Sequence, residues 1–155
     1  ANRALAQAAR TGRPLTLLMI DHDHFKRAND CMGHAFGDRL LCAFIELARQ
    51  TLRGADVLCR HGGEEFVALL PDTESAQARA VADRLRRAYA TLPAACEVGG
   101  TVSIGCATLR PGEGLASLLD RADRALYFAK EAGRNRVICA DPDSNAKIAF
   151  PARAG

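Results

Sequence analysis

Runs and alternations of apolar residues predict five strands along the chain. An unbroken apolar run from Leu15 to Ile20 predicts a central strand that is buried on both faces. Two short strands are predicted at residues 57–60 and 66–70. The two glycines between them allow a tight reversal with positive φ, so the pair predicts a β-hairpin. Alternation over residues 102–106 and a short apolar stretch at residues 136–139 predict the last two strands.

Helical spacing of apolar residues predicts four helices. A short helix is expected from Asp23 through Ala28, with the Asp23 carboxylate capping its start and Gly33 closing it. A long helix is expected over residues 37–53. The other two helices have apolar stripes at Ala78, Val81, Ala82, Leu85, Tyr89 and Leu92, and at Leu115, Leu118, Leu119, Ala122, Leu126 and Ala129.

The order βααββαβαβ predicts an α/β (α+β) fold, in which a central mixed sheet with an antiparallel hairpin is flanked by helices. A chain of 155 residues, 48% hydrophobic and 25% charged, suits one globular domain and excludes a disordered or coiled-coil chain. We expect residues 1–140 to form this domain and residues 141–155 to be a loosely ordered tail. The abrupt start at Ala1 favours a domain cut from a longer polypeptide.

The net charge limits which partners are expected, and the cysteine content indicates the cellular compartment. The net charge of +3 is too slight to predict a nucleic-acid partner, so an anionic partner should be small. No apolar segment is long enough for a membrane span. The six cysteines form no CxxC pair, which favours small buried side chains in a reducing, cytoplasmic compartment over a disulfide or zinc framework. They are Cys31, Cys42, Cys59, Cys96, Cys106 and Cys139.

Acidic residues follow the first strand and the two glycines of the hairpin. If the two strands are neighbours, the carboxylates of Asp21 and Glu64 meet at one edge of the sheet, where a cation would relieve their repulsion. A few hard oxygen ligands suit Mg²⁺, with Mn²⁺ as the alternative. Taken alone, each acidic motif also has a plain explanation, namely a helix cap at Asp23 and a solvated turn at Glu64-Glu65.

Other polar residues near these acids are candidates for binding a nucleotide. Gly62 and Gly63 would let a flat or anionic ligand touch the backbone. Lys26 would neutralise phosphate charge, while Asn29 and Asp38 offer acceptors to the N–H groups of a base such as guanine. Each again has a structural alternative: a surface charge for Lys26, a helix end for Asn29 and a helix cap for Asp38.

These motifs form one pattern along nearly the whole chain. It comprises Asp21-His22-Asp23-His24-Phe25-Lys26, Asn29-Asp30, Gly33-His34, Gly37-Asp38, Arg60-His61-Gly62-Gly63-Glu64-Glu65-Phe66, Ser103-Ile104-Gly105 and Lys130-Glu131-Ala132-Gly133-Arg134-Asn135. From about Asn2 to Cys139, the pattern resembles the GGDEF family of diguanylate cyclases, with the signature in its GGEEF form. Because the family accepts the GGEEF form, the resemblance implies an active enzyme.

The resemblance implies a fold similar to the palm of class III nucleotidyl cyclases, and a reaction that joins two GTP into cyclic di-GMP with release of two pyrophosphates. It implies that Asp21 and the backbone carbonyl of His22 hold the metal. Glu64 would be both a metal ligand and the general base for the ribose 3′-hydroxyl, with Glu65 beside it in the catalytic group, while Asp23 would be architectural. Lys26, Lys130 and Arg134 would contact phosphates, and Asn29 and Asp38 would read guanine.

One domain offers one GTP pocket, whereas the product needs two GTP facing each other, so we expect catalysis across a two-fold homodimer. An upstream sensor or regulatory domain would set the dimer geometry in bacterial second-messenger signalling. The parent protein would be either soluble or bound to a membrane, with this domain in the cytosol.

An RxxD motif, Arg53-Gly54-Ala55-Asp56, precedes the two glycines at the spacing of the family's inhibitory site. The resemblance implies that cyclic di-GMP binds there as a product inhibitor. A guanidinium fork suits phosphate oxygens or the O6 and N7 acceptors of guanine. Arg84, on the following helix, is a candidate second contact. The alternative is that Arg53 ends a helix, Asp56 leads a strand, and both face water.

Two histidines depart from the family pattern. His22 stands where a branched apolar residue is usual, and His61 where an aromatic or apolar one is. Both are expected to titrate near neutrality, so His22→Ile should flatten the pH profile of activity between about pH 6 and 7.5.

Two other functions compete with the cyclase. One is a catalytically silent module that binds cyclic di-GMP or GTP and signals to an attached domain, which the intact Asp21, Lys26 and Glu64 argue against. The other is a cyclase that accepts ATP in one half-site. Asp38 argues against it, because a carboxylate pairs with guanine N–H groups and repels the corresponding acceptor of adenine.

Overall fold

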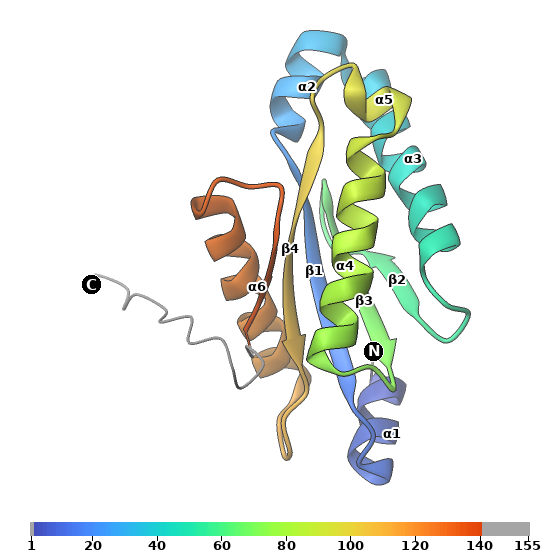
Figure 1. The fold of residues 1–155 in the computed structure, drawn as a ribbon, viewed down its shortest axis with the longest axis vertical. Coiled ribbons are helices and arrows are strands. Elements are labelled where there is room, and N and C mark those ends of the chain that lie inside the picture. The colour runs from blue at the N-terminus through green and yellow to red at the C-terminus, as the bar shows by residue number, and fades with distance from the viewer. Residues whose placement is uncertain (1, 141–155) are drawn as a thin grey trace.

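The computed structural model describes residues 2–140 and contains a five-stranded sheet with helices on both faces (Figure 1). The strand order is β2-β3-β1-β4-β5, antiparallel except for the parallel pair β4–β5. The mixed sheet and its hairpin are thus confirmed. The strands are β1 (Leu15–Asp23), β2 (Val57–Arg60), β3 (Glu65–Pro71), β4 (Thr101–Thr108) and β5 (Val137–Cys139). The expected tail, residues 141–155, lies outside the described residues.

Side-chain alternation along β1 divides the core into two layers. Leu18 and Ile20 pack with the helices α2 to α5, while Leu17 and Met19 pack with α1 and α6 on the opposite face, as Figure 1 shows for α4 and α6. All nine residues of β1 are buried, so the prediction of a central strand is confirmed. The helices are α1 (Asn2–Thr11), α2 (Phe25–Met32), α3 (His34–Thr51), α4 (Ser75–Ala90), α5 (Pro93–Cys96) and α6 (Leu115–Glu131).

Several helix boundaries differ from the predicted ones. Gly33, with φ of 84°, ends α2 as expected, but α3 begins directly after it. Asp38 therefore lies in the second turn of α3 and is not its cap. Helices α1 and α5 were not predicted, because α5 is a single turn and α1 packs on the core through only Ala4, Leu5 and Ala8. No helix within residues 2–140 has the length and apolar character that a membrane crossing requires.

The cysteines correct a second expectation. Only Cys106 and Cys139 are buried, and they lie opposite each other on β4 and β5. The other four are exposed: Cys31, Cys42, Cys59 and Cys96. They occupy outward positions of helices and of the edge strand β2, so an apolar neighbour in sequence did not imply burial.

Candidate active site

The end of β1 brings acidic residues from two strands together. In the register of the sheet, Asp21 lies opposite Glu65 of β3, and Glu64 is the residue before it in the turn. Residues directly opposite on antiparallel strands share a face, so the carboxylates of Asp21 and Glu65 lie on the same side. The structure therefore places Asp21, Glu64 and Glu65 at one end of the sheet.

Lys130, near the end of α6, supplies the counter-charge. Its Nζ lies 2.8 Å from Oδ2 of Asp21, whose exposed fraction is only 6%. Burial raises the pKa of Asp21 above its ordinary value of 3.8. The bond from Lys130 opposes this shift, and the negative charges of Glu64 and Glu65 add to it. The ionised Asp21 is thus held at an energetic disadvantage, which one lysine only partly offsets.

Close packing of α6 on β4 puts Lys130 within reach of Asp21. A Cβ on Gly105 would overlap the carbonyl oxygen of Ala122 and would lie 2.9 Å from the Cα of Leu126. Only glycine lets the helix approach the strand this closely. This contact explains physically why Ser103-Ile104-Gly105 and the lysine of α6 belong to one pattern.

The donor set of this site fits a hard divalent cation. Asp21, Glu64 and Glu65 offer carboxylate oxygens around a nearly buried negative charge. Within residues 2–140, no three His, Cys, Asp or Glu side chains are gathered closely enough to form a complete metal cage. This arrangement suits Mg²⁺, which keeps waters and takes oxygens from substrate phosphates.

Side-chain contacts, and not positive φ angles at the glycines, shape the hairpin. Neither Gly62 nor Gly63 has positive φ, so that prediction was wrong. A Cβ on Gly62 would instead lie 2.9 Å from Oε2 of Glu65, whereas one on Gly63 would meet open space. The Arg60 guanidinium donates to the carbonyl oxygens of Gly62 and Gly63, with Nε at 3.3 and 3.0 Å. Arg60, which sequence reasoning missed, therefore braces the tip from the strand that precedes it.

Asp23 anchors a loop and does not cap a helix. Its carboxylate accepts bonds from the hydroxyls of Thr101 and Ser103, both at 2.7 Å, and from the backbone N–H of Asn135 at 3.1 Å. β1 accordingly continues through Asp23, and α2 starts without a side-chain cap. Asp23 thus fixes the segment that carries Arg134, which supports its architectural role.

The candidate guanine-binding residues lie on α2 and α3. Asn29 Oδ1 is buried and has no hydrogen-bond partner among the described residues. A Cβ on Gly37 would overlap this oxygen, so glycine keeps the space beside it open. Lys26, on α2, and Asp38, on α3, have exposed side chains. An unpartnered buried acceptor costs about 1–3 kcal/mol, which an N–H of a bound base would recover.

His22 belongs to the core and not to the titrating surface. It is buried, its Nδ1 lies 2.9 Å from the Tyr89 hydroxyl, and the rings of Phe25, Phe44 and Phe66 surround it. Burial, aided by the charge of Arg60, lowers its pKa to about 3. The expectation that His22 titrates near neutrality was therefore wrong. His61 is exposed in the hairpin.

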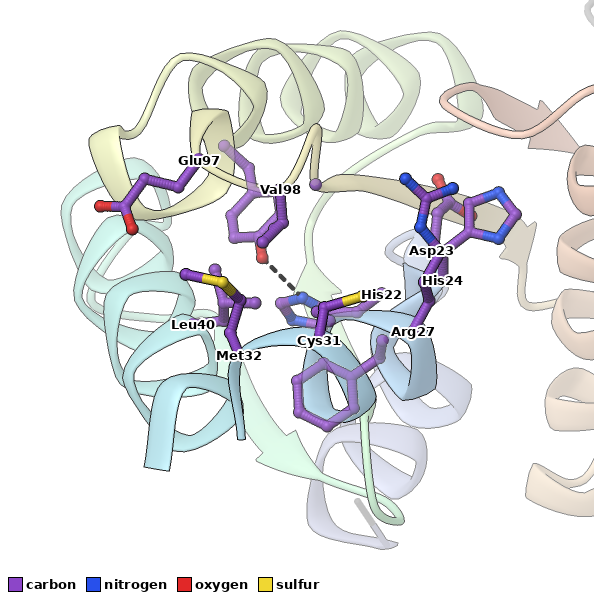
Figure 2. A pocket seen from close by; sticks show the side chains of 13 residues that line it. His22, Asp23, His24, Arg27, Cys31, Met32, Leu40, Glu97 and Val98 are labelled. Carbon is purple, nitrogen blue, oxygen red and sulfur yellow. Dashed lines mark hydrogen bonds between the residues drawn. The ribbon is translucent and has the colours of Figure 1, made fainter. Parts of the chain in front are cut away.

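A cavity of about 210 Å³ lies beside His22 and is distinct from the acidic site. Figure 2 shows His22 amid the lining side chains, with Met32 and Leu40 on one side and Arg27 and His24 on the other. None of the residues predicted to bind metal through a side chain, phosphate or guanine lines it. This cavity is therefore not the candidate nucleotide site.

The RxxD motif lies in a second cavity, of about 420 Å³. Arg53 and Asp56 both line it, together with Arg49 and Arg60. The Asp56 carboxylate accepts a bond of 2.8 Å from the backbone N–H of Arg53, which fixes the turn. Arg84 is not among the lining residues, and its Nη2 donates to the carbonyl oxygen of Thr51 at 2.9 Å.

Similar proteins place this arrangement in a family. A family model described as diguanylate cyclase, GGDEF domain, matches residues 1–136. The response regulator PleD of Caulobacter vibrioides is 41% identical over 133 residues, which cover 82% of this chain and 29% of PleD. Diguanylate cyclase DgcP of Pseudomonas aeruginosa is 42% identical over 136 residues, 86% of this chain and 20% of DgcP. The chain thus spans less than a third of the length of these relatives.

Solved structures agree with the sequence relatives. The active GGEEF domain of a diguanylate cyclase from Vibrio cholerae has a TM-score of 0.85 at 34% identity, covering 91% of this chain and 92% of that one. The GGDEF domain of DgcB from Caulobacter crescentus, in complex with c-di-GMP, has a TM-score of 0.82 at 32% identity, covering 89% and 84%. The expected cyclase palm fold is confirmed, and the chain belongs to the GGDEF-domain family of diguanylate cyclases.

Proposed function

We propose that this domain condenses two GTP into cyclic di-GMP and two pyrophosphates, and that it does so in the cytoplasm as a homodimer in which each protomer presents one GTP. The observation that carries the proposal is the nearly buried Asp21, bonded to Lys130 and lying opposite Glu65 beside the glycine hairpin. This arrangement supplies acidic groups for a cation and a base, and a basic group for phosphate.

In the proposed reaction, a Glu64 oxygen accepts the proton of the attacking ribose 3′-hydroxyl. Lys26, Lys130 and Arg134 bind the triphosphate and offset charge on the departing pyrophosphate. Lys130 pairs with Asp21 in the free protein, and in the proposed complex its ammonium group turns towards the phosphates. Asp21, Glu64 and the carbonyl of His22 would hold Mg²⁺ or Mn²⁺, which when bound supplies positive charge to the reacting phosphate.

Guanine is the base that the helix pair α2–α3 favours. The unpartnered Oδ1 of Asn29 and the carboxylate of Asp38 are acceptors, and the Watson–Crick edge of guanine offers N–H donors to both. Adenine lacks the ring N–H that a carboxylate would accept. We therefore expect GTP to be used and ATP to be rejected.

The cavity at Arg53 and Asp56 supports product inhibition. It is large enough for part of a nucleotide and presents three guanidinium groups, from Arg49, Arg53 and Arg60. Arg60 also braces the hairpin tip. A ligand that engages Arg60 in this cavity would therefore act on the backbone that carries Glu64.

Incubation with Mg²⁺ and either GTP or ATP, followed by anion-exchange chromatography, tests the proposal. Cyclic di-GMP should appear with GTP alone, and Glu64→Gln should lower the rate by about 10²-fold or more, as expected for loss of a general base. If the wild-type chain and Glu64→Gln are equally silent even when joined to a dimerising coiled coil, the chain is a binding module and the proposal fails.

A further inference from the structure

The two flanks of α4 carry separate sets of arginines. Arg84 faces α3 and reaches Thr51. Residues spaced three and four apart on the other flank face β5. Together with residues 135–137, they line a groove of about 460 Å³. Its lining residues are Ala76, Arg79, Ala80, Asp83, Arg86, Arg87, Asn135, Arg136 and Val137. The groove contains none of the residues assigned above to substrate, metal or product.

Charge in this groove is unbalanced. Asp83 is its only acid, and this carboxylate already pairs with Arg86 and Arg87, both at 2.7 Å. Arg79 forms no hydrogen bond or ion pair with any residue in the part of the chain that the structure describes. The Nε of Arg136 donates only to a backbone carbonyl, that of Arg134, at 3.0 Å. Two guanidinium groups therefore line the groove without an acidic partner.

Two of the groove arginines, Arg86 and Arg136, hold a strained segment of backbone. Gly133, Arg134 and Asn135 have consecutive positive φ values of 107°, 60° and 46°. Such conformations are costly for residues with a side chain and persist only when neighbours enforce them. Arg86 donates to Oδ1 of Asn135 at 2.8 Å, and Arg136 holds the carbonyl of Arg134. The groove therefore borders the segment that presents Arg134.

We propose that this groove is a binding site for a small phosphate-bearing anion, held between Arg79 and Arg136. Guanidinium forks match phosphate oxygens and bind them through two parallel hydrogen bonds. The apolar lining consists of Ala76, Ala80 and Val137, so it offers no ring on which a base would stack. The phosphate itself is thus the recognised group, either as the free ion or as a monoester.

Binding here also acts on the loop that follows α6. An anion that fixes the Arg136 side chain stabilises its bond to the Arg134 carbonyl, and with it the strained conformation of the segment. The consequence for triphosphate binding rests on the proposed function, because it assigns Arg134 to phosphate. The binding itself does not, and it can be measured without GTP or metal.

The test is a titration of the metal-free and nucleotide-free chain with sodium phosphate, and separately with AMP, at an ionic strength held constant with sodium chloride. Nε–Hε resonances of arginine are followed in ¹H–¹⁵N spectra. We expect saturable shifts at Arg79 and Arg136, accompanied by the backbone amides of Arg134 and Asn135. Equal affinities indicate free phosphate as the ligand, and tighter binding of AMP indicates a monoester.

Variants test whether phosphate binds in this groove or at other basic residues on the surface. Arg79→Gln, which removes no described contact, and the double variant Arg79→Gln/Arg136→Gln should weaken phosphate binding, the latter about tenfold or more. Arg10→Gln, on the exposed side of α1, should leave it unchanged. The proposal is overturned if the shifts grow linearly without saturation, if they occur only around Lys26 and Lys130, or if both groove variants bind phosphate as the wild type does.

Discussion

The burial of Asp21 lowers the stability of the folded protein at the site where we expect its carboxylate to function. Its carboxylate is nearly buried beside Glu64 and Glu65, and the folded protein disfavours its ionised form. Groups held in such unfavourable states are typical of functional sites. In the absence of a cation, the ion pair with Lys130 stabilises the ionised carboxylate of Asp21.

Asp21→Asn should therefore separate folding from activity. Without divalent cations at pH 7, its thermal midpoint should be at least as high as that of the wild type, because the uncharged amide escapes both burial of charge and repulsion. Cyclase activity should fall by about 10²-fold or more. Scanning calorimetry and a GTP turnover assay measure the two effects. A clearly lower midpoint would mean that the Asp21–Lys130 bond outweighs the repulsion.

His22 predicts a pH dependence of stability instead of activity. The unfolded chain protonates this residue below about pH 6.5, whereas the folded protein keeps it neutral down to about pH 3. The stability that the folded protein gains from keeping His22 neutral is fully present above pH 6.5 and is lost as the pH falls towards 3. Between pH 7.5 and 5, this linkage costs about 2 kcal/mol of unfolding free energy.

Denaturant unfolding at pH 7.5 and at pH 5 measures this cost. The loss of stability at the lower pH should be about 2 kcal/mol smaller in His22→Ile than in the wild type. Tyr89→Phe keeps the imidazole and should retain the wild-type dependence, which makes it the matched control. An identical pH dependence in all three proteins would contradict the assignment.

The packing of α6 on the sheet depends on the close approach at Gly105. Gly105→Ala would force a methyl group into the backbone of α6. We expect a loss of about 1–3 kcal/mol or more in unfolding free energy, and weaker activity because Lys130 moves. Gly114→Ala, where a Cβ meets nothing within 4 Å, should cost less than about 1 kcal/mol. Equal losses in a chemical denaturation series would show that the α6–β4 contact is not specially tight.

The elements also show what the sequence can and cannot predict. The apolar run of β1, the hairpin and the stripe of α6 were predictable, because each is encoded by its own residues. The continuation of β1 to Asp23 was not, because the hydroxyls that satisfy this carboxylate come from Thr101 and Ser103, far along the chain. Burial of His22 was hidden for the same reason, since its aromatic neighbours come from α2, α3, α4 and β3.

At the scale of the whole molecule, the proposed reaction needs two copies of the chain. Each copy of the chain has one acidic site, with one Asp21 and one Glu64, which suits one GTP. Activity per protomer should therefore rise with protein concentration and reach a plateau once the dimer is saturated. A fused coiled coil should remove this dependence. Constant activity per protomer over a concentration range in which sedimentation shows only monomer would rule out the dimer.

The RxxD cavity predicts a second property of the whole molecule. Cyclic di-GMP accumulating during turnover should slow the wild type, and Arg53→Ala should weaken this inhibition at least about tenfold, because one charged hydrogen-bonding group is lost. Initial rates should change little, since Arg53 lines the RxxD cavity and Asp21 does not. Progress curves with and without added cyclic di-GMP provide the measurement. Unchanged inhibition would place the product elsewhere.

The alternation of roles along Asp21, His22 and Asp23 has a consequence for how this chain tolerates change. One residue faces the acidic site, the next fills the aromatic core, and the third ties down a distant loop. Inserting or deleting one residue within β1 would exchange these roles, pushing a carboxylate among aromatic rings and an imidazole towards the acids. Length variation among functional descendants of this sequence should therefore be absent from β1, even where its individual side chains are replaced.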